Sequence, residues 1–514
     1  MKNNISNSSK VSEKCKKMLE QYGRQKSKRK RRLTVVKFGG GVIGKNGENI
    51  PLVVERIKTI GERSDVGPFV IVSASKDLTS LAIKVGLEYA SSGIGELILL
   101  SNPYLWIKDN YMIEPYKSNF IHELSDCFIK VERALDQIAE NKEFVNVNRA
   151  RVLAYSGEVL MGIALSYVLN SYGLESTHIQ IENWPIVTDK NFENANFLEE
   201  ESRLRINHLV NPLEEGKIVT MGGYIGMTKD GLETTYGRGG SDKTAANLTM
   251  LLKDVYDITL DFEKSSIVLS ADPEIKNIDR KELEEIHYLS YNEAILAGQF
   301  GMKILTPSAV RDVYEAGYDI PMVITDFRNP EHVTWIKREV ECNGDSIKIV
   351  TGKKNCALFS LDINMRKSFR DYLKKIKRFH DFYELATDEI NRKSRFLLLD
   401  GEFVKRNEEE LKAYDEHATV EYGLAAITLV GDRMAEAPGV VAESFVAIKE
   451  RYPKLNILDG TIQRPTSLIL LVVSDDDAEK AVSAIHATRK YVNKKVKLAD
   501  YYTMFTGNLG WSVI

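Results

Sequence analysis

A short apolar strand that runs directly into three glycines is the feature that most constrains this chain. Residues 33–38 read Leu-Thr-Val-Val-Lys-Phe, a largely β-branched run, and Gly39-Gly-Gly41 follows at once. Residues 69–73 form a second, nearly all-apolar run, typical of a strand buried on both faces of a parallel sheet. Glycines at such a strand end let backbone N–H groups approach an anion, but a plain turn has the same pattern. The feature therefore predicts a parallel α/β sheet and leaves both interpretations of the glycines open.

The chain continues this alternation of strands and helices up to about residue 336. Pro51 suits the first turn of a helix over residues 51–63, and another helical run covers residues 243–252. Further strands are expected near residues 218–220 and 258–261. Strands that alternate with helices predict an α/β domain with a mostly parallel sheet over residues 33–336.

The order of elements changes beyond residue 344. A strand, a helix, two strands and a helix follow one another, which is the order of the small ferredoxin-like unit. These elements are expected at residues 425–430, 438–448, 456–458, 468–473 and 476–489. A weaker first copy is expected as a strand at 346–350, a helix at 365–379 and a strand at 395–400. The charged stretch 405–416 is interpreted as an exposed connection, so residues 345–514 predict a region of two tandem units.

Composition excludes several classes of protein. The 514 residues are too many for one hydrophobic core, and a net charge of -3 favours neither a nucleic-acid binder nor a membrane protein. The longest apolar runs fall short of the roughly 20 residues of a membrane helix. Four cysteines without CxxC spacing indicate reduced thiols in a cytoplasm rather than disulfides or a zinc site. Residues 1–32 are polar, basic at their end and without a signal-peptide core, which predicts a solvated tail outside the fold.

An arginine set among glycines marks a candidate site. Residues 234–245 read Thr-Thr-Tyr-Gly-Arg-Gly-Gly-Ser-Asp-Lys-Thr-Ala, with Ser241 and Asp242 just before the predicted helix. Arg238 between glycines can reach a carboxylate with two parallel hydrogen bonds. Asp242 can alternatively be a helix N-cap worth about 1 kcal/mol. Consecutive glycines lose much conformational entropy on folding, and a helix cap alone does not explain why the chain carries them here. The interpretation of this segment as a binding site is therefore favoured.

Taken together, these segments and several others resemble the aspartate kinases. The resemblance covers residues 33–336, and the C-terminal units resemble the ACT domains that follow the kinase domain in that family. It implies a three-layer amino-acid kinase fold with a mostly parallel sheet, plus C-terminal ferredoxin-like ACT units. The motifs that carry it are Lys37-Phe-Gly-Gly40, residues 73–79, Ser156-Gly-Glu158, Val187-Thr-Asp189, residues 237–242, Ser270-Ala-Asp-Pro273, residues 289–294 and Gly301-Met-Lys-Ile304.

The resemblance implies roles for individual residues in phosphorylating the side-chain carboxylate of L-aspartate with ATP. Lys37 would stabilise the transferring phosphoryl group, and Asp242 would position the substrate amine or the active-site lysine. The residues implied to bind aspartate are Thr79, Glu158, Arg238 and Ser241. Those implied to bind the nucleotide are Lys37, Gly39, Gly40, Gly41, Leu260, Asp261, Lys303 and Ile304.

These residue types suit phosphoryl transfer, which depends on positioning and charge neutralisation. The attacking aspartate carboxylate is ionised at neutral pH, so the reaction needs no general base. Magnesium is expected to arrive with ATP and to be held chiefly by phosphate oxygens, without a dedicated protein metal site.

The nucleotide side departs from the family pattern at several positions. Gly41-Val42 stands where the family has Thr-Ser, Leu269 replaces a tyrosine and Glu274 replaces an arginine. A glutamate that faced a triphosphate would repel it, so Glu274 is expected to point elsewhere. We expect Lys264 to supply the missing charge to the nucleotide. The departures open one alternative, a kinase-like amino-acid sensor that turns over slowly or not at all. A kinase of glutamate or a nucleotide is disfavoured by the ACT units and by the Arg238 segment.

The ACT units imply an amino-acid effector and assembly into a homodimer or a dimer of dimers. Residues 430–439 form the turn from strand to helix at which such an effector would bind, the carboxylate meeting the helix N-terminus. A simple connecting turn is the alternative. Residues 460–467 depart from the family pattern, which leaves the identity of the effector open.

Overall fold

The computed structural model describes residues 29–506 except 238, 304–305, 340–345, 376–381, 386, 433, 435–438 and 464–467, with side chains up to residue 494. The chain divides into two compact units. Residues up to 267 together with 308–338 form the first unit, and residues 268–307 together with those from 339 onward form the second. This division differs from the predicted boundary near residue 336, because an internal segment of the predicted kinase region belongs to the second unit.

The first unit is built on a mostly parallel sheet, as predicted. Its strands lie in the order β3-β5-β2-β1-β8-β10-β11, and each neighbouring pair from β3 to β10 is parallel, whereas β10 and β11 are antiparallel. The strands are β1 (Arg32–Phe38), β2 (Val66–Val72), β3 (Ser176–His178), β5 (Ile218–Gly222), β8 (Asp257–Lys264), β10 (Met322–Asp326) and β11 (Val333–Lys337). A small sheet of β4 (Val187–Thr188), β6 (Ile225–Thr228) and β7 (Glu233–Thr235) lies in the same unit.

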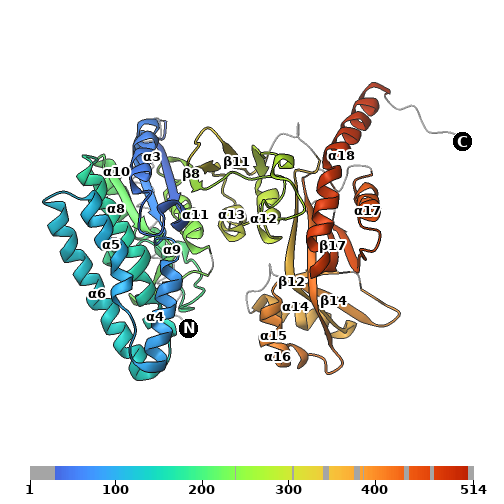
Figure 1. Ribbon diagram of the computed structural model, residues 1–514, viewed down its shortest axis with the longest axis horizontal. Coiled ribbons are helices and arrows are strands. Elements are labelled where there is room, and N and C mark those ends of the chain that lie inside the picture. Colours follow the sequence, from blue (N-terminus) through green and yellow to red (C-terminus); the bar gives the residue numbers. More distant parts are fainter. Residues whose placement is uncertain are drawn as a thin grey trace, which may run out of the picture. The chain divides into compact units, whose positions relative to one another are not determined.

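Helices cover both faces of the parallel sheet and make three layers. Thr220 donates a hydrogen bond of 2.7 Å to the Gly162 carbonyl of α8, whereas Lys37 on the opposite face contacts α11. The long helices α4, α5 and α6 lie beside one another outside this core (Figure 1). The helices are α2 (Gly40–Ile43), α3 (Ile50–Arg63), α4 (Leu78–Ser92), α5 (Ile98–Tyr111), α6 (Tyr116–Asn141), α7 (Asn146–Leu153), the π-helix η1 (Ala154–Glu158), α8 (Val159–Ser171), α9 (Glu199–Arg203), α10 (Asn207–Glu214), α11 (Gly240–Leu252) and α13 (Pro307–Glu315).

The second unit is built on one antiparallel sheet with strand order β13-β14-β12-β15-β17-β16. Its strands are β12 (Ile349–Asp362), β13 (Phe382–Glu384), β14 (Lys393–Leu398), β15 (Thr419–Val430), β16 (Asp459–Gln463) and β17 (Leu468–Ser474), and β9 (Tyr288–Ser290) lies in the segment 268–307. Its helices are α12 (Tyr291–Gln299), α14 (Arg366–Lys375), α15 (Gly401–Arg406), α16 (Glu408–Lys412), α17 (Val440–Arg451) and α18 (Ala478–Thr506). The ferredoxin-like order β-α-β-β-α is thus confirmed.

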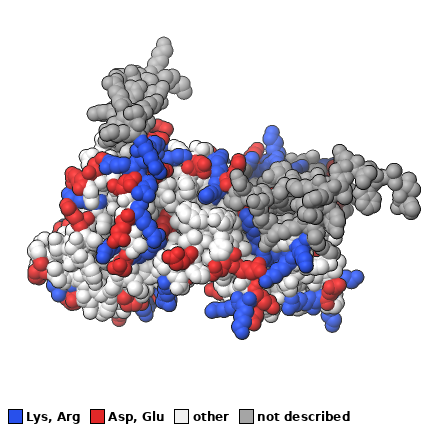
Figure 2. Space-filling view, turned by 90° about the horizontal axis from the view of Figure 1, so that it is seen from above, with Lys and Arg blue, Asp and Glu red and all other residues white. Residues whose placement is uncertain are grey.

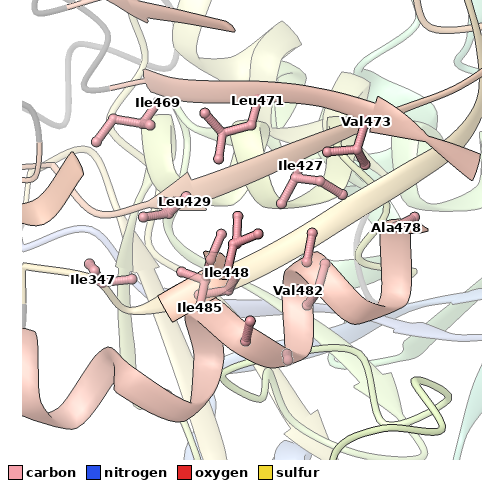
Figure 3. Packing of buried hydrophobic residues seen from close by; sticks show 14 of the residues in the cluster. Ile347, Ile427, Leu429, Ile448, Ile469, Leu471, Val473, Ala478, Val482 and Ile485 are labelled. Carbon is pink, nitrogen blue, oxygen red and sulfur yellow. The ribbon is translucent and has the colours of Figure 1, made fainter. Parts of the chain in front are cut away.

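Two ferredoxin-like units share the long strands β12 and β15. The C-terminal half of β12 and the N-terminal half of β15 enclose the first core with β14, α14, α15 and α16. The other halves of the same strands pack with β17, α17 and α18 around the second core, where Val482 and Ile485 of α18 meet Ile427 of β15 (Figure 3). Along the chain, the first ferredoxin-like unit is therefore inserted into the second, and these two ferredoxin-like units are not simply consecutive as expected.

Two details of the predicted C-terminal elements are wrong. The stretch 405–416 is not an exposed connection, because it contains α16 and buries Leu411 in the first ferredoxin-like core. The strand expected at residues 456–458 lies instead at β16, three residues later, where Thr461 pairs with Leu470 of β17. One buried leucine places the first stretch in a core, and pairing with β17 places the second strand; local periodicity detects neither.

The described surface carries charges of both signs. Basic and acidic side chains are interspersed on the described part of the face in Figure 2, which agrees with the small net charge. Within the described residues, one helical stretch, 146–171, has the length and hydropathy of a membrane span, but 94% of its apolar window is buried inside the structure, as in a core helix.

Candidate active site

Two lysines converge on one buried aspartate at the carboxyl ends of the central strands. Lys37 Nζ lies 2.8 Å from Asp242 Oδ1, and Lys264 Nζ lies 2.9 Å from Asp242 Oδ2. Lys37 and Asp242 are buried, and the Lys264 side chain is 20% exposed. The three side chains therefore form a compact cluster with net charge +1.

Strand register explains why these residues meet. Lys37 of β1 pairs with Phe262 of β8, and side chains alternate along a strand, so Lys264 projects from the same face as Lys37. Helix α11 packs on that face of β1 and β8 and carries Asp242 in its first turn. The helix begins at Gly240, earlier than expected, with Gly239 as its N-cap and Asp242 inside its first turn, so Asp242 is not the N-cap residue.

The electrostatics of the cluster keep Asp242 ionised. Burial opposes the charge, but Lys264 and Lys37 outweigh it and hold the pKa of Asp242 well below its usual range. Burial also lowers the pKa of Lys264, with Lys37 acting in the same direction and Asp242 opposing both. The shared carboxylate thus holds two ammonium groups close together in a buried site. There each ammonium group attracts an incoming anion more strongly than it would in water.

Glu158 presents a buried carboxylate without a complete set of partners. It is 4% exposed, and its Oε2 has no hydrogen-bond partner among the described residues. Burial raises the pKa of Glu158 to about 7, opposed by backbone N–H groups of Glu158 and Ala74 and by Lys37. A buried carboxylate oxygen of this kind costs free energy unless a cation or donor reaches it, so the group is suited to a ligand ammonium.

A π-helical turn positions Glu158. Residues of η1 depart from α-helical geometry at Gly157 (φ -125°, ψ -107°), and π-turns are frequent at functional sites. The Tyr104 hydroxyl lies 3.0 Å from the Ser156 carbonyl and 2.7 Å from the Gly157 carbonyl, which fixes the turn. Gly222 at the end of β5 allows close approach, because a Cβ there would lie 2.2 Å from the Glu158 carbonyl oxygen.

The N-terminal glycines lie beside Lys37. A Cβ added to Gly39 would lie 3.3 Å from Lys37 Nζ, and one added to Gly40 would lie 2.6 Å from the Ala74 carbonyl oxygen. Gly40 and Gly41 begin the short helix α2, and a Cβ at Gly41 would meet nothing within 4 Å. The glycine run therefore brings backbone close to the ammonium of Lys37 and leaves space at Gly41.

Asp261 is not part of the lysine cluster. It lies on the opposite face of β8, where its carboxylate accepts a hydrogen bond of 2.8 Å from Thr325 and one of 3.3 Å from Arg56. Arg56 also donates to Glu263 at 2.5 Å. Burial raises the pKa of Asp261 to about 6 and that of Glu263 to about 8, because one arginine serves two buried carboxylates. Asp261 thus buttresses the strand that carries Lys264.

The other predicted residues are distributed between the two units. Thr79 lies at the start of α4, half-buried, Ser241 lies buried in the first turn of α11, and Leu260 is fully buried in β8. Lys303 belongs to the second unit, where it forms an ion pair with Glu274. Glu274 thus contacts Lys303, one of the residues predicted to bind the nucleotide. Arg238 and Ile304 lie outside the described residues, as do Arg433 and residues 435–438 of the predicted effector turn.

Sequence reasoning missed the support of Glu158. Tyr104 carries no recognisable motif, because its role depends on a helix 52 residues away in the chain. Gly222-Gly223 had a usable signal: it follows an apolar strand, like the glycines after Phe38. A Cβ at Gly223 would lie 2.5 Å from Ser241 Cβ, so this second glycine pair lets α11 approach the sheet.

Two ammonium groups held at the carboxyl end of a parallel sheet can neutralise the negative charge of a transferring phosphoryl group. The first unit therefore has the site of a kinase. The sequence profile described as the amino acid kinase family matches residues 32–326. The chain belongs to that family.

Relatives and solved structures agree with this assignment. Aspartokinase 2 of Bacillus subtilis (strain 168) is 28% identical over 291 residues, which is 54% of this chain and 68% of the relative. Aspartokinase 1, chloroplastic, of Arabidopsis thaliana is 24% identical over 480 residues, 88% of this chain and 79% of the relative. The structure of E. coli aspartokinase III in complex with aspartate and ADP is 20% identical with a TM-score of 0.72 and covers 88% of this chain and 99% of its own. The shared fold extends over both units, so the expected kinase fold with C-terminal ACT units is confirmed.

Proposed function

We propose that the chain transfers the γ-phosphoryl group of ATP to the side-chain carboxylate of L-aspartate, which gives 4-phospho-L-aspartate and ADP. The observation that carries this proposal is the buried, incompletely bonded carboxylate of Glu158 beside the Lys37 cluster, in a chain whose relatives are aspartokinases. An α-ammonium group completes the bonding of Glu158 and places an amino acid next to the phosphoryl-transfer lysines.

Lys37 and Lys264 supply positive charge where negative charge accumulates on the transferring group. The aspartate carboxylate attacks the γ-phosphorus, a new P–O bond forms, and the bond between that phosphorus and the bridging oxygen of ADP breaks. The electron pair of the broken bond leaves with ADP, so no proton has to move. Asp242 keeps both lysines oriented through its contacts of 2.8 and 2.9 Å. Magnesium enters with ATP and is held chiefly by phosphate oxygens, since Asp242 is already engaged by two lysines.

Binding roles for several residues follow from family resemblance and position. Thr79 and Ser241 would hold the aspartate, and Arg238 would clamp a substrate carboxylate. Asp261 would act on the nucleotide side through its strand rather than through the lysine cluster. Lys303 and Ile304 would contact the nucleotide.

Regulation by an amino acid is part of the proposal. A structure of E. coli aspartokinase III contains lysine and aspartate, and it covers 89% of this chain with a TM-score of 0.65. By analogy, the ACT units of this chain would bind an effector, and a homodimer or dimer of dimers would carry paired effector sites. A cytoplasmic location fits a substrate pair of ATP and free aspartate.

Aspartate-dependent release of ADP tests the proposal. Purified protein is assayed with MgATP and L-aspartate, with L-glutamate as the competing acceptor, and then with lysine, threonine and methionine added separately. The expected result is turnover with aspartate that exceeds turnover with glutamate and falls with at least one of the three effectors. Effector binding without aspartate-dependent turnover would instead establish the non-catalytic sensor.

A further inference from the structure

A buried glutamate of the first unit takes no direct part in the reaction described above. Glu233 is the first residue of β7, and each of its two carboxylate oxygens accepts a hydrogen bond. The Tyr155 hydroxyl donates to Oε1 at 2.8 Å, and Arg151 Nε donates to Oε2 at 2.9 Å. Burying a carboxylate is costly unless its oxygens are paired, so these two donors hold the Glu233 side chain in one position.

Both donors belong to the continuous helix 146–171, which also carries Glu158. Arg151 lies in α7 and Tyr155 lies about one turn further on in η1, so both side chains reach the same strand. Glu158 is the last residue of η1, and α7 packs against β7. Glu233 therefore joins the turn that presents Glu158 to strand β7.

The η1 turn is held by two different kinds of contact. Tyr104 of α5 contacts two of its backbone carbonyls, whereas Glu233 contacts the side chain of one of its residues, Tyr155. A π-turn departs from the regular geometry of the α-helices on either side of it. Its position, and with it the position of the Glu158 carboxylate, therefore depends on contacts from neighbouring elements.

The tyrosine end of this connection keeps its proton. Burial raises the pKa of Tyr155 well above its usual range, and Glu233 acts in the same direction. The hydroxyl therefore donates to Glu233 throughout the pH range of an enzyme assay. Lys130 Nζ of α6 lies 4.5 Å from the centroid of the Tyr155 ring and helps to hold the ring. The contact is a fixed connection rather than a switch.

Strand β7 also leads to the lysine cluster. Helix α11, which carries Asp242 in its first turn, follows β7 directly in the order of elements. Thr234 of β7 shares a hydrogen bond of 2.7 Å with Thr188 of β4, which fixes the strand in the small sheet. Glu233 therefore ties the turn of Glu158 to a strand that is itself fixed and that continues to Asp242.

We infer that Glu233 is a positioning residue for aspartate binding: through Tyr155 and Arg151 it holds the turn at which Glu158 meets the substrate ammonium group. The inference rests on the proposed function, because that function places the ammonium group at Glu158. It goes further by naming a residue outside the motifs of the site that fixes the position of the ammonium contact within the first unit.

The test compares two tyrosine-to-phenylalanine variants. Tyr155→Phe removes the hydroxyl that reaches Glu233 and leaves the ring in the core. Tyr318→Phe is the matched control, because the Tyr318 hydroxyl donates at 2.7 Å to Glu199, whose carboxylate also binds Arg203 at 2.7 Å. Each variant removes one hydroxyl from a cluster of a tyrosine, an arginine and a glutamate in the first unit, but the control cluster lies outside α7, η1 and β7.

Both variants should lose similar stability in urea unfolding, since each loses one hydrogen bond to a carboxylate. Only Tyr155→Phe should raise the KM for aspartate, by about tenfold, because a small displacement of Glu158 weakens its contact with the ammonium group. The KM for ATP should change by less than about twofold in both variants. Such a split between the two substrates is not expected from a merely structural contact.

Two substitutions of the glutamate itself complete the series. Glu233→Ala removes both contacts with the helix and should raise the KM for aspartate at least as much as Tyr155→Phe. Glu233→Gln keeps an acceptor for the Tyr155 hydroxyl and gives up the charge that holds Arg151, so its KM should rise less than in Glu233→Ala. Should Glu233→Ala fail to fold, the comparison of Tyr155→Phe with Tyr318→Phe decides the question.

Calorimetric titration measures the same effect without turnover. The Kd for L-aspartate should rise in Tyr155→Phe and stay near the wild-type value in Tyr318→Phe, while the Kd for MgADP stays constant in both. An unchanged aspartate affinity in Tyr155→Phe, an equal loss in Tyr318→Phe, or a parallel loss of MgADP affinity overturns the inference. In each of these cases aspartate turnover by the wild-type protein leaves the proposed function standing. Wild-type protein without aspartate-dependent turnover or aspartate binding would overturn the proposed function and the inference with it.

Discussion

Lowering the pH from 8 to 6 should weaken aspartate binding through Glu158. In the ligand-free protein, burial raises the pKa of this carboxyl to about 7. A substrate ammonium binds the ionised form and not the protonated one, so protonation competes directly with aspartate. Because the pKa of an acid is raised here, the binding-competent form is dominant above about pH 7 and lost below it.

The magnitude follows from the ionised fraction. With a pKa of about 7, roughly nine-tenths of the Glu158 side chains are ionised at pH 8 and roughly one-tenth at pH 6. The apparent dissociation constant is the intrinsic constant divided by this fraction, so the KM for aspartate should rise about tenfold over the interval. At pH 7, half of the sites are protonated, and aspartate binding should release about 0.5 proton per site.

Initial rates at saturating MgATP give the KM for aspartate across this range, and calorimetry in two buffers of different ionisation enthalpy gives the proton release. The matched control is Glu158→Gln, which keeps the shape of the side chain and cannot titrate. Its KM should be high at pH 8 and nearly constant down to pH 6, which separates Glu158 from Asp261 and Glu263, whose raised pKa values fall in the same window. A wild-type KM that stays constant from pH 8 to 6 refutes the assigned role of Glu158.

Other substitutions test the remaining parts of the site. Lys264→Ala should raise the KM for ATP by more than about tenfold in steady-state assays, and an unchanged value excludes contact between Lys264 and the nucleotide. Asp242→Asn leaves two buried lysines without a counter-ion; urea unfolding should show a loss of about 3–5 kcal/mol, and wild-type stability would contradict the buried cluster. Gly222→Ala places a Cβ 2.2 Å from the Glu158 carbonyl oxygen, so the KM for aspartate should rise more than that for ATP. An equal rise in both constants would mean a general loss of structure.

Local signals in the chain predicted the central strands of the first unit. The strands β1, β2, β5 and β8 appear where short apolar runs were found, since a strand buried on both faces has to be apolar along its length. The helix after Pro51 and the glycines after Phe38 also lie where expected. Lys37 and Asp242 could be proposed as members of a phosphoryl-transfer site because both lie in motifs that resemble those of the aspartate kinases.

Contacts between distant residues escaped prediction. The position of Glu158 depends on Tyr104 and Gly222, which lie 54 and 64 residues away in the chain and carry no pattern that links them. The stretch 405–416 has a charged composition, yet one buried leucine makes it part of a core. Periodicity averages over neighbours along the chain, whereas burial is decided by neighbours in space.

The sequence by itself therefore determined the parallel α/β domain, the ferredoxin-like order that follows it, and the residue types of a phosphoryl-transfer site. Tertiary structure alone decided how these parts are combined. Strand register put Lys264 on the face of Lys37 and Asp261 on the other, and the folding of the segment 268–307 joined a kinase motif to α18 of the ACT region. The physical reason is that secondary structure and motif chemistry are local properties of the chain, while side-chain partners are set by which surfaces the whole chain buries together.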